Sequence, residues 1–175
     1  MRGPALGGEV KALARTCVLL LVAYVVQLGL LDDMRVFSVH AEVLLAIGVA
    51  SAVAWGAERG ALVSFAAGLL ADLALSGRFG VTALAWGLTG YGVGVISDAL
   101  ARRSRLMDAV LMFAGGAVGT MAYAVIAALF GAQTLGEDDL LVIVVMVGLW
   151  NAVLSPLVVP AARWAGDHPD LRPAR

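Results

Sequence analysis

The sequence predicts an all-α integral membrane protein, a bundle of about six transmembrane helices. Of its 175 residues 61% are hydrophobic, and the mean hydropathy is +0.93. Charged residues make up 14%, against about a quarter in soluble domains. The apolar residues also fall into six runs of helix length, separated by short polar segments. A soluble domain needs more polar groups to cover its surface, so lipid is the expected solvent.

The six apolar runs define the expected helices. They cover approximately residues 12–31, 41–57, 60–75, 81–100, 106–131 and 140–164. We expect residues 1–164 to form a single polytopic membrane domain, followed by a short tail at 165–175. The first run is too long for a signal peptide and has no small-residue cleavage site, which predicts an uncleaved helix. The third run is short for a hydrocarbon core of ~30 Å, so it either spans a distorted bilayer or is re-entrant.

The distribution of basic residues predicts the orientation of the bundle. With six spans, ten Lys and Arg residues lie on the side of both termini, and only Arg35 and Arg78 lie on the other. We expect the protein to lie in the cytoplasmic membrane of a bacterium. Because Lys and Arg are enriched in cytoplasmic loops, we expect both termini in the cytoplasm and Glu137–Asp139 on the outer side of the membrane. A five-span arrangement would place the cluster Arg102–Arg105 outside, which this distribution disfavours.

Several classes of function receive no support from the sequence. A net charge of −1 argues against a nucleic-acid partner. Cys17 is the single cysteine, so no intrachain disulfide and no cysteine-based metal site is expected. The chain has no Walker lysine, no His-Glu-x-x-His motif and no nucleophile elbow. We therefore predict neither an enzyme nor a cofactor-binding or metal-binding protein.

Small residues recur at four-residue spacing in three of the predicted helices. In the third run these positions are Gly60, Ser64, Gly68, Asp72 and Ser76. In the fourth run they are Gly90, Gly94 and Asp98, with Gly87 and Tyr91 on a second row. In the fifth run they are Gly115 and Gly119. Small residues let two backbones approach closely, which is a main source of helix association in lipid. We expect helices three to five to pack tightly together. The alternative is a docking face for another membrane protein.

Asp72 is the most informative polar residue. A carboxylate near the outer end of the third helix is costly in hydrocarbon and needs a partner or water. We expect it to be paired or hydrogen-bonded, with Arg78 as the favoured partner; contact with a ligand or partner protein, or a proton relay, are the alternatives. Asp98 and Asp108 are expected to be solvated charges at helix ends.

The last helix contains prolines. Pro156 leaves the carbonyl four residues earlier without its helical hydrogen bond, and a nearby Ser or Asn can help to satisfy that carbonyl. Asn151 and Ser155 are the nearby candidates. We expect a kink at this position.

Residues 60–94 contain Gly68-Leu69-Leu70-Ala71-Asp72, then Phe79-Gly80-Val81 and Gly90-Tyr91-Gly92. This segment resembles the bacterial rod shape-determining protein MreD family. The family typically carries a Gly-Leu-Leu-x-Asp segment, a turn that ends in Gly, and a hydrophobic span with Gly-Tyr. The segment from Asn151 to Pro160 resembles the family's last helix. One departure is His40-Ala41-Glu42, where a proline-containing entry is expected.

The resemblance implies a non-enzymatic member of the cell-elongation and peptidoglycan-synthesis machinery, involved in cell shape. Such proteins sit in the membrane lipid with MreC and are linked to MreB, RodA and a class B penicillin-binding protein. Their fold is similar to the substrate-binding subunits of energy-coupling-factor transporters, so a vitamin-binding membrane subunit is the alternative. The stripes and the resemblance together mark candidates for helix packing or partner contact. These are Ser64, Gly68, Asp72, Arg78, Gly80, Gly90, Tyr91, Gly94, Asn151 and Pro156.

Overall fold

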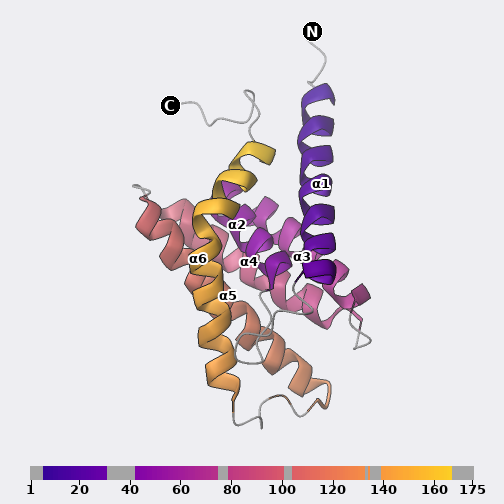
Figure 1. Ribbon diagram of the computed structural model, residues 1–175, viewed down its shortest axis with the longest axis vertical. Helices are drawn as coiled ribbons and strands as arrows, with labels where there is room; N and C mark the ends of the chain where they lie inside the picture. Colours follow the sequence, from indigo (N-terminus) through magenta and orange to yellow (C-terminus); the bar gives the residue numbers. More distant parts are fainter. Residues whose placement is uncertain are drawn as a thin grey trace.

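The computed structural model describes residues 6–30, 42–74, 79–100, 104–132, 134 and 139–166. Its described residues form helices and no strands, as expected from the sequence (Figure 1). The helices are α1 (Leu6–Leu30), α2 (Val43–Trp55), α3 (Ala57–Ala74), α4 (Val81–Ala99), α5 (Arg105–Leu129) and α6 (Leu140–Gly166). Three of them, α1, α5 and α6, are long and apolar enough to cross a membrane. The described part of the chain is therefore all-helical, and its three candidate membrane spans are consistent with an all-α membrane protein.

Each predicted helix corresponds to one observed helix, with differences at the ends. The largest difference is at α1, which begins at Leu6 and not at residue 12. The third helix begins at Ala57 and not at residue 60. The break lies at Gly56, whose φ of 84° is left-handed, and the polar residue Glu58 stands in the first turn of α3. An acidic side chain there is favoured by the helix dipole.

Helix α2 forms the centre of the bundle. Ten consecutive residues, Leu44–Val53, are buried, and α2 contacts all five other described helices. At ~1.5 Å per residue, its 13 residues extend only ~20 Å. A helix that is apolar on every side is expected to be enclosed by protein or lipid. Here the enclosing surface is the protein itself.

Helices α3 and α4 form an antiparallel hairpin and share the most extensive helix contact in the molecule. A Cβ atom on Gly68 would lie 2.5 Å from the Cα of Ala83, so the two backbones touch at this point. Cβ atoms on Gly90 and Gly94 would collide with Ser64 and Ala57, respectively. Close packing between the third and fourth helices is thus confirmed. α3 is one continuous helix from Ala57 to Ala74.

The small-residue stripes also contact α2, which the sequence analysis did not anticipate. A Cβ on Gly60 would collide with Ala52, and Ser64 packs on Gly48. In α5, Gly115 and Gly119 lie against Val49 and Leu45 of α2 as well as against α4. Helices three to five therefore pack around α2, and each described stripe serves contacts within the chain.

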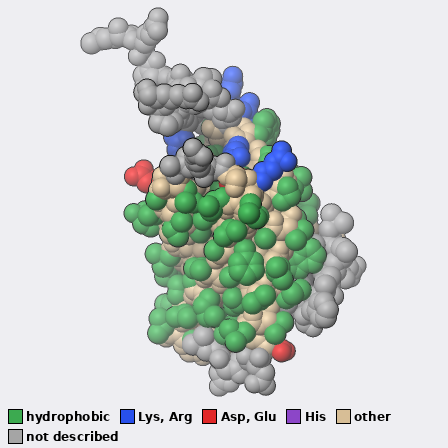
Figure 2. All heavy atoms as spheres, turned by 90° about the vertical axis from the view of Figure 1, so that its left-hand side faces the viewer, with side chains coloured by type: hydrophobic (Ala, Val, Ile, Leu, Met, Phe, Trp, Pro, Cys, Tyr) green, Lys and Arg blue, Asp and Glu red, His purple; other side chains and the backbone are tan. Residues whose placement is uncertain are grey.

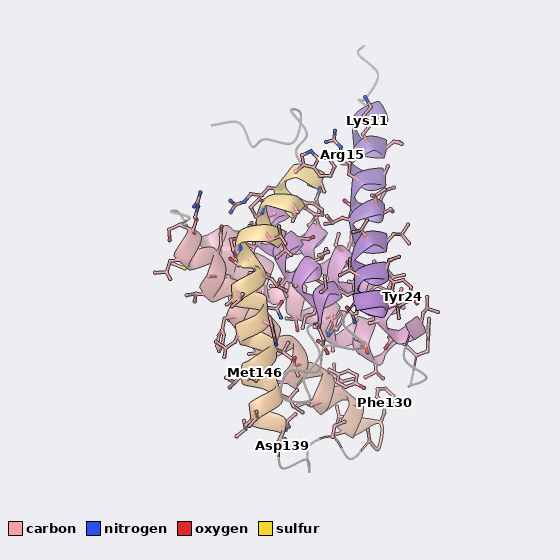
Figure 3. All side chains as sticks on the ribbon, in the orientation of Figure 1. Lys11, Arg15, Tyr24, Phe130, Asp139 and Met146 are labelled. Carbon is pink, nitrogen blue, oxygen red and sulfur yellow. The ribbon has the colours of Figure 1, made fainter. Side chains whose placement is uncertain are left out.

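The helices alternate in direction, so the bundle has two ends. At the termini end α1 begins and α6 finishes (Figure 1). Arg15 stacks over the Trp164 ring there, with the guanidinium carbon 5.0 Å from the ring centroid. Lys11 and Arg15 lie at this end, and Phe130 and Asp139 lie at the opposite end (Figure 3). Figure 2 shows hydrophobic side chains across the middle of one face, with basic side chains gathered near one end. This distribution suits a protein embedded in a membrane.

Candidate functional site

Asp72 lies at the last turn of α3 and caps the first turn of α4. Its side chain is buried, with 8% of the residue exposed. Oδ2 accepts hydrogen bonds from the backbone N–H groups of Gly80 (2.8 Å) and Ala83 (3.2 Å), and Oδ1 accepts one from Thr82 (3.3 Å). The first N–H groups of a helix have no partner within it, and the helix dipole favours a negative charge there. Asp72 is therefore hydrogen-bonded as expected, and its observed partners are backbone groups. Arg78 lies outside the described residues.

Gly80 explains why a residue from another helix provides this cap. It occupies the N-cap position of α4 with φ 95°, a left-handed conformation that favours glycine. Glycine has no side chain with which to cap the helix itself. The carboxylate of Asp72 takes that role from across the hairpin.

Asp98 makes the reciprocal contact at the termini end. It lies at the end of α4, and its Oδ2 accepts a hydrogen bond from the N–H of Ala57, the first residue of α3, at 3.1 Å. A Cβ on Gly56 would lie 2.6 Å from both carboxylate oxygens, so glycine makes room for the carboxylate. Beside it, Ser97 Oγ donates to the carbonyl of Val53 near the end of α2, at 3.0 Å. We call the α3–α4 unit with Asp72 and Asp98 the capped hairpin.

Asp108 is not solvated, which corrects the sequence-based expectation. It is buried in the first turn of α5, and its Oδ2 accepts a hydrogen bond from Nη2 of Arg163 on α6 at 2.7 Å. The partner is 55 residues away in the chain, so local sequence gives no sign of it. The expectation for Asp98 needs a smaller change, because its side chain is exposed yet caps α3.

Asn151 holds α6 against α5. It is buried, and a Cβ on Gly116 would lie 2.7 Å from its Nδ2 atom. Nδ2 donates to the carbonyl of Val147 at 2.8 Å. This is the carbonyl one turn before Asn151, and not the one that Pro156 leaves free. α6 continues through both Pro156 and Pro160, whose side chains are exposed.

A small cavity lies at the end of the bundle opposite the termini. Its volume is about 100 Å³, and its lining includes Gln27, Glu42, Thr82, Thr120 and Tyr123. Gln27 Oε1 accepts a hydrogen bond from the N–H of Leu44 at 3.1 Å, so α1 caps α2. Glu42 Oε2 is buried and has no hydrogen-bond partner. Sites for drug-sized ligands typically measure ~300–1,000 Å³, so this cavity suits water or a small ion better than a vitamin.

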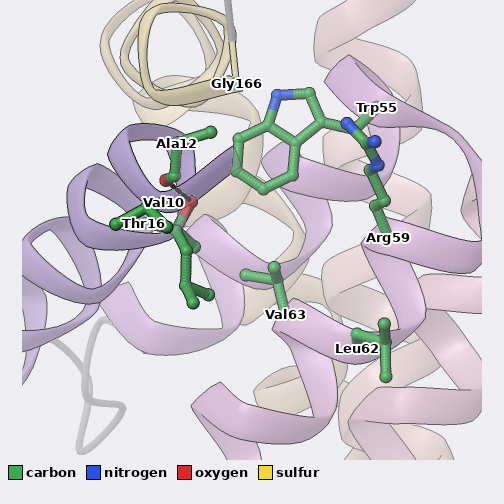
Figure 4. Close-up of a pocket in the computed structure, with 9 residues that line it drawn as sticks. Val10, Ala12, Thr16, Trp55, Arg59, Leu62, Val63 and Gly166 are labelled. Carbon is green, nitrogen blue, oxygen red and sulfur yellow. Dashed lines mark hydrogen bonds between the residues drawn. The ribbon is translucent and has the colours of Figure 1, made fainter. Parts of the chain in front are cut away.

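A larger groove of about 440 Å³ lies at the termini end, between α1 and α3 (Figure 4). Trp55, Arg59 and Gly166 line it together with apolar side chains. Among the residues that the structure describes, no group of three His, Cys, Asp or Glu side chains could hold a metal ion.

Sequence reasoning missed the role of α2, the Gln27 cap and the Arg163–Asp108 ion pair. For α2 a signal existed, because Val43–Trp55 contains no charged side chain, whereas each of the other five described helices contains at least one. The other two contacts join residues far apart in the chain and have no local signal. Neither a protein-family model, nor a curated protein, nor a solved structure matches this chain.

Proposed function

We propose that the protein is a non-enzymatic scaffold of the bacterial cell-elongation and peptidoglycan-synthesis complex. It acts in the cytoplasmic membrane with MreC, and with MreB, RodA and a class B penicillin-binding protein directly or through MreC. The observation that carries the proposal is the capped hairpin. The residues that resemble the MreD family, Gly68, Asp72, Gly80 and Gly90, are the ones that build its internal contacts.

A rigid hairpin suits a scaffold because the polar groups are used to hold helices together. Asp72 and Asp98 accept hydrogen bonds from the helix that each one faces, and Asp108 pairs with Arg163. A scaffold acts by confining its partners to one complex, which turns a diffusive encounter into an intramolecular one. This role requires a stable shape and an accessible surface.

The outer face of α4 is the surface that we assign to partner contact. Tyr91 is 53% exposed, and Leu84, Leu88 and Val95 are exposed on the same helix. Gly92 has no other atom within 4 Å of where its Cβ would be, so its lack of a side chain serves no contact inside the molecule. A glycine on an exposed helix surface lets a second transmembrane helix approach closely.

Partner capture gives a direct test of this surface. We expect a tagged wild-type protein, purified from the native host, to retain MreC, and Gly92→Trp to lose most of it. Gly29→Trp on α1 is the matched control, because Gly29 is also exposed and has open space around it. Depletion of the protein should misplace wall growth. Normal wall growth after depletion, or equal MreC recovery with both variants, would contradict the proposal.

The orientation is part of the proposal and has its own test. With both termini in the cytoplasm, a cysteine at Gln133 should react with an impermeant reagent added outside the cell. A cysteine at Arg103 should react only after the membrane is opened. Labelling of Arg103→Cys from outside would contradict the six-span arrangement.

The alternative is a membrane subunit that binds a small molecule. The cavity at the opposite end favours it, because Glu42 and several hydroxyl-bearing side chains line it. Its volume of about 100 Å³ disfavours a vitamin. Normal wall growth with impaired vitamin uptake after depletion would select this alternative over the scaffold.

A further inference from the structure

The groove at the termini end has the shape of a site for one hydrocarbon chain. Its walls are Val10 and Leu13 of α1 and Leu62 and Val63 of α3. Leu13 and Leu62 are among the most exposed large apolar residues of the protein, so the groove is open to its surroundings. Its volume of about 440 Å³ lies within the usual ~300–1,000 Å³ for ligand sites. For a membrane-embedded helix pair, those surroundings include lipid chains.

The polar groups of the groove are donors without acceptors. Trp55 Nε1 is buried and has no hydrogen-bond partner, and an indole nitrogen can only donate. Arg59 lines the same groove, and no ion pair holds its guanidinium among the described residues (Figure 4). The Thr16 hydroxyl is already used, since it donates to the carbonyl of Ala12 at 2.9 Å. The indole nitrogen lies against Gly166, where a Cβ would collide with it, so the donor that the groove offers to an anionic group is the Arg59 guanidinium.

Basic side chains outnumber acidic ones on the two helix stretches that form the groove. Lys11 and Arg15 follow Glu9 on α1, and Arg59 follows Glu58 on α3. Basic pockets between transmembrane helices bind acidic lipid head groups, and Arg suits phosphate through paired hydrogen bonds. A tryptophan with an apolar ring and a polar N–H is suited to the boundary between chains and head groups.

We propose that this groove binds one anionic phospholipid. One acyl chain lies between α1 and α3, and the phosphate accepts hydrogen bonds from the Arg59 guanidinium. The lipid joins α1 to the bundle at a place where the protein itself makes little contact. Only 17% of the membrane-length stretch of α1 is buried, and its contact with α3 is the smallest between any two touching helices. This inference is independent of the proposed function.

Lipid titration of the purified, delipidated full chain in detergent tests the proposal. Phosphatidylglycerol and phosphatidylcholine with the same acyl chains are added separately, and binding is counted by native mass spectrometry. We expect one phosphatidylglycerol to bind in preference to phosphatidylcholine. Arg59→Gln should reduce that preference by about fivefold, since each basic residue near an anionic surface contributes that much. Arg105→Gln is the matched control, because Arg105 is an exposed basic residue at the termini end outside the groove.

Two further arms separate a lipid from a free anion and from general charge attraction. Val63→Trp should fill the groove and weaken phosphatidylglycerol binding while the charge is unchanged. Inorganic phosphate alone should produce no protection of the protein against thermal unfolding. Equal loss of preference in Arg59→Gln and Arg105→Gln would overturn the proposal. So would unchanged lipid binding in Val63→Trp, or protection by phosphate equal to that by phosphatidylglycerol.

Discussion

At each end of the capped hairpin, an aspartate on one helix caps the start of the other helix, but one aspartate is buried and the other is exposed. At the end away from the termini, Asp72 is buried and accepts three backbone hydrogen bonds from the start of α4. At the termini end Asp98 is exposed and accepts one, from the N–H of Ala57 at the start of α3. Each carboxylate sits near the C-terminal end of its own helix, where the dipole disfavours it, and at the N-terminal end of its neighbour, where the dipole favours it.

The difference between the ends concerns the availability of water. Exposed N–H groups at the start of α3 can bond to water if Asp98 is removed. The N–H groups of Thr82 and Ala83 at the start of α4 are in buried hydrogen bonds, and an unsatisfied buried donor is costly. The same residue type therefore stabilises the two ends by different amounts. Substitutions along the hairpin can test this comparison.

The largest effect is expected from Gly68→Leu, which acts on the half of the hairpin near Asp72. A side chain at this position would meet the backbone of Ala83 and Thr82, which cannot move aside as a flexible side chain can. Overpacking typically costs ~1–3 kcal/mol, and we expect the upper end of that range. Thermal unfolding in detergent is the measurement. Gly92→Leu, on the open face of the same hairpin, should leave the melting temperature nearly unchanged. A normal melting temperature for Gly68→Leu would contradict the close approach of α3 and α4.

Asp72→Ala should have the next largest effect. Three N–H groups lose their acceptor, and two of them, those of Thr82 and Ala83, are in buried hydrogen bonds, which we expect to destabilise the protein by about 2–3 kcal/mol. Asp72→Asn should recover part of the loss, because the amide oxygen can still accept while the charge is gone. The free energy of unfolding in denaturant is the measurement for both variants. Equal stability of Asp72→Ala and the wild type would show that the cap contributes nothing.

Asp98→Ala should have the smallest effect of the three. Its single hydrogen bond lies where water can replace it, so we expect a loss below about 1 kcal/mol. The loss should also shrink as salt is added, because exposed electrostatic contributions are screened. A loss as large as that of Asp72→Ala, independent of salt, would contradict the assigned role of burial.

The sequence predicts the helices of this fold well, but it predicts few of the side-chain hydrogen bonds and ion pairs that join them. The apolar runs predict all six observed helices, and the stripe predicts the contact of Gly68 with the neighbouring helix. The second apolar run, residues 41–57, contains α2. Hydrophobic periodicity cannot show that α2 is the central helix, because a helix that is apolar on all sides has no distinguishable face. The pairing of Asp72 with Arg78 stays a prediction, because Arg78 lies outside the described residues. The backbone partners of Asp72 are groups that charge patterns do not reveal. The pairing of Asp108 with Arg163 depends on how α5 meets α6, which one sequence does not specify.

Amide hydrogen exchange tests reciprocal capping most directly. Exchange is measured by mass spectrometry on the wild type, Asp72→Ala and Asp98→Ala in the same detergent. We predict that Asp72→Ala speeds exchange in the segment 80–83 and leaves the start of α3 unchanged. Asp98→Ala should do the reverse, with faster exchange at residues 57–60 and none of the effect at the start of α4. If both variants instead raised exchange evenly along α3 and α4, or left both helix starts protected, the carboxylates would not cap the neighbouring helices, and the central claim would be wrong.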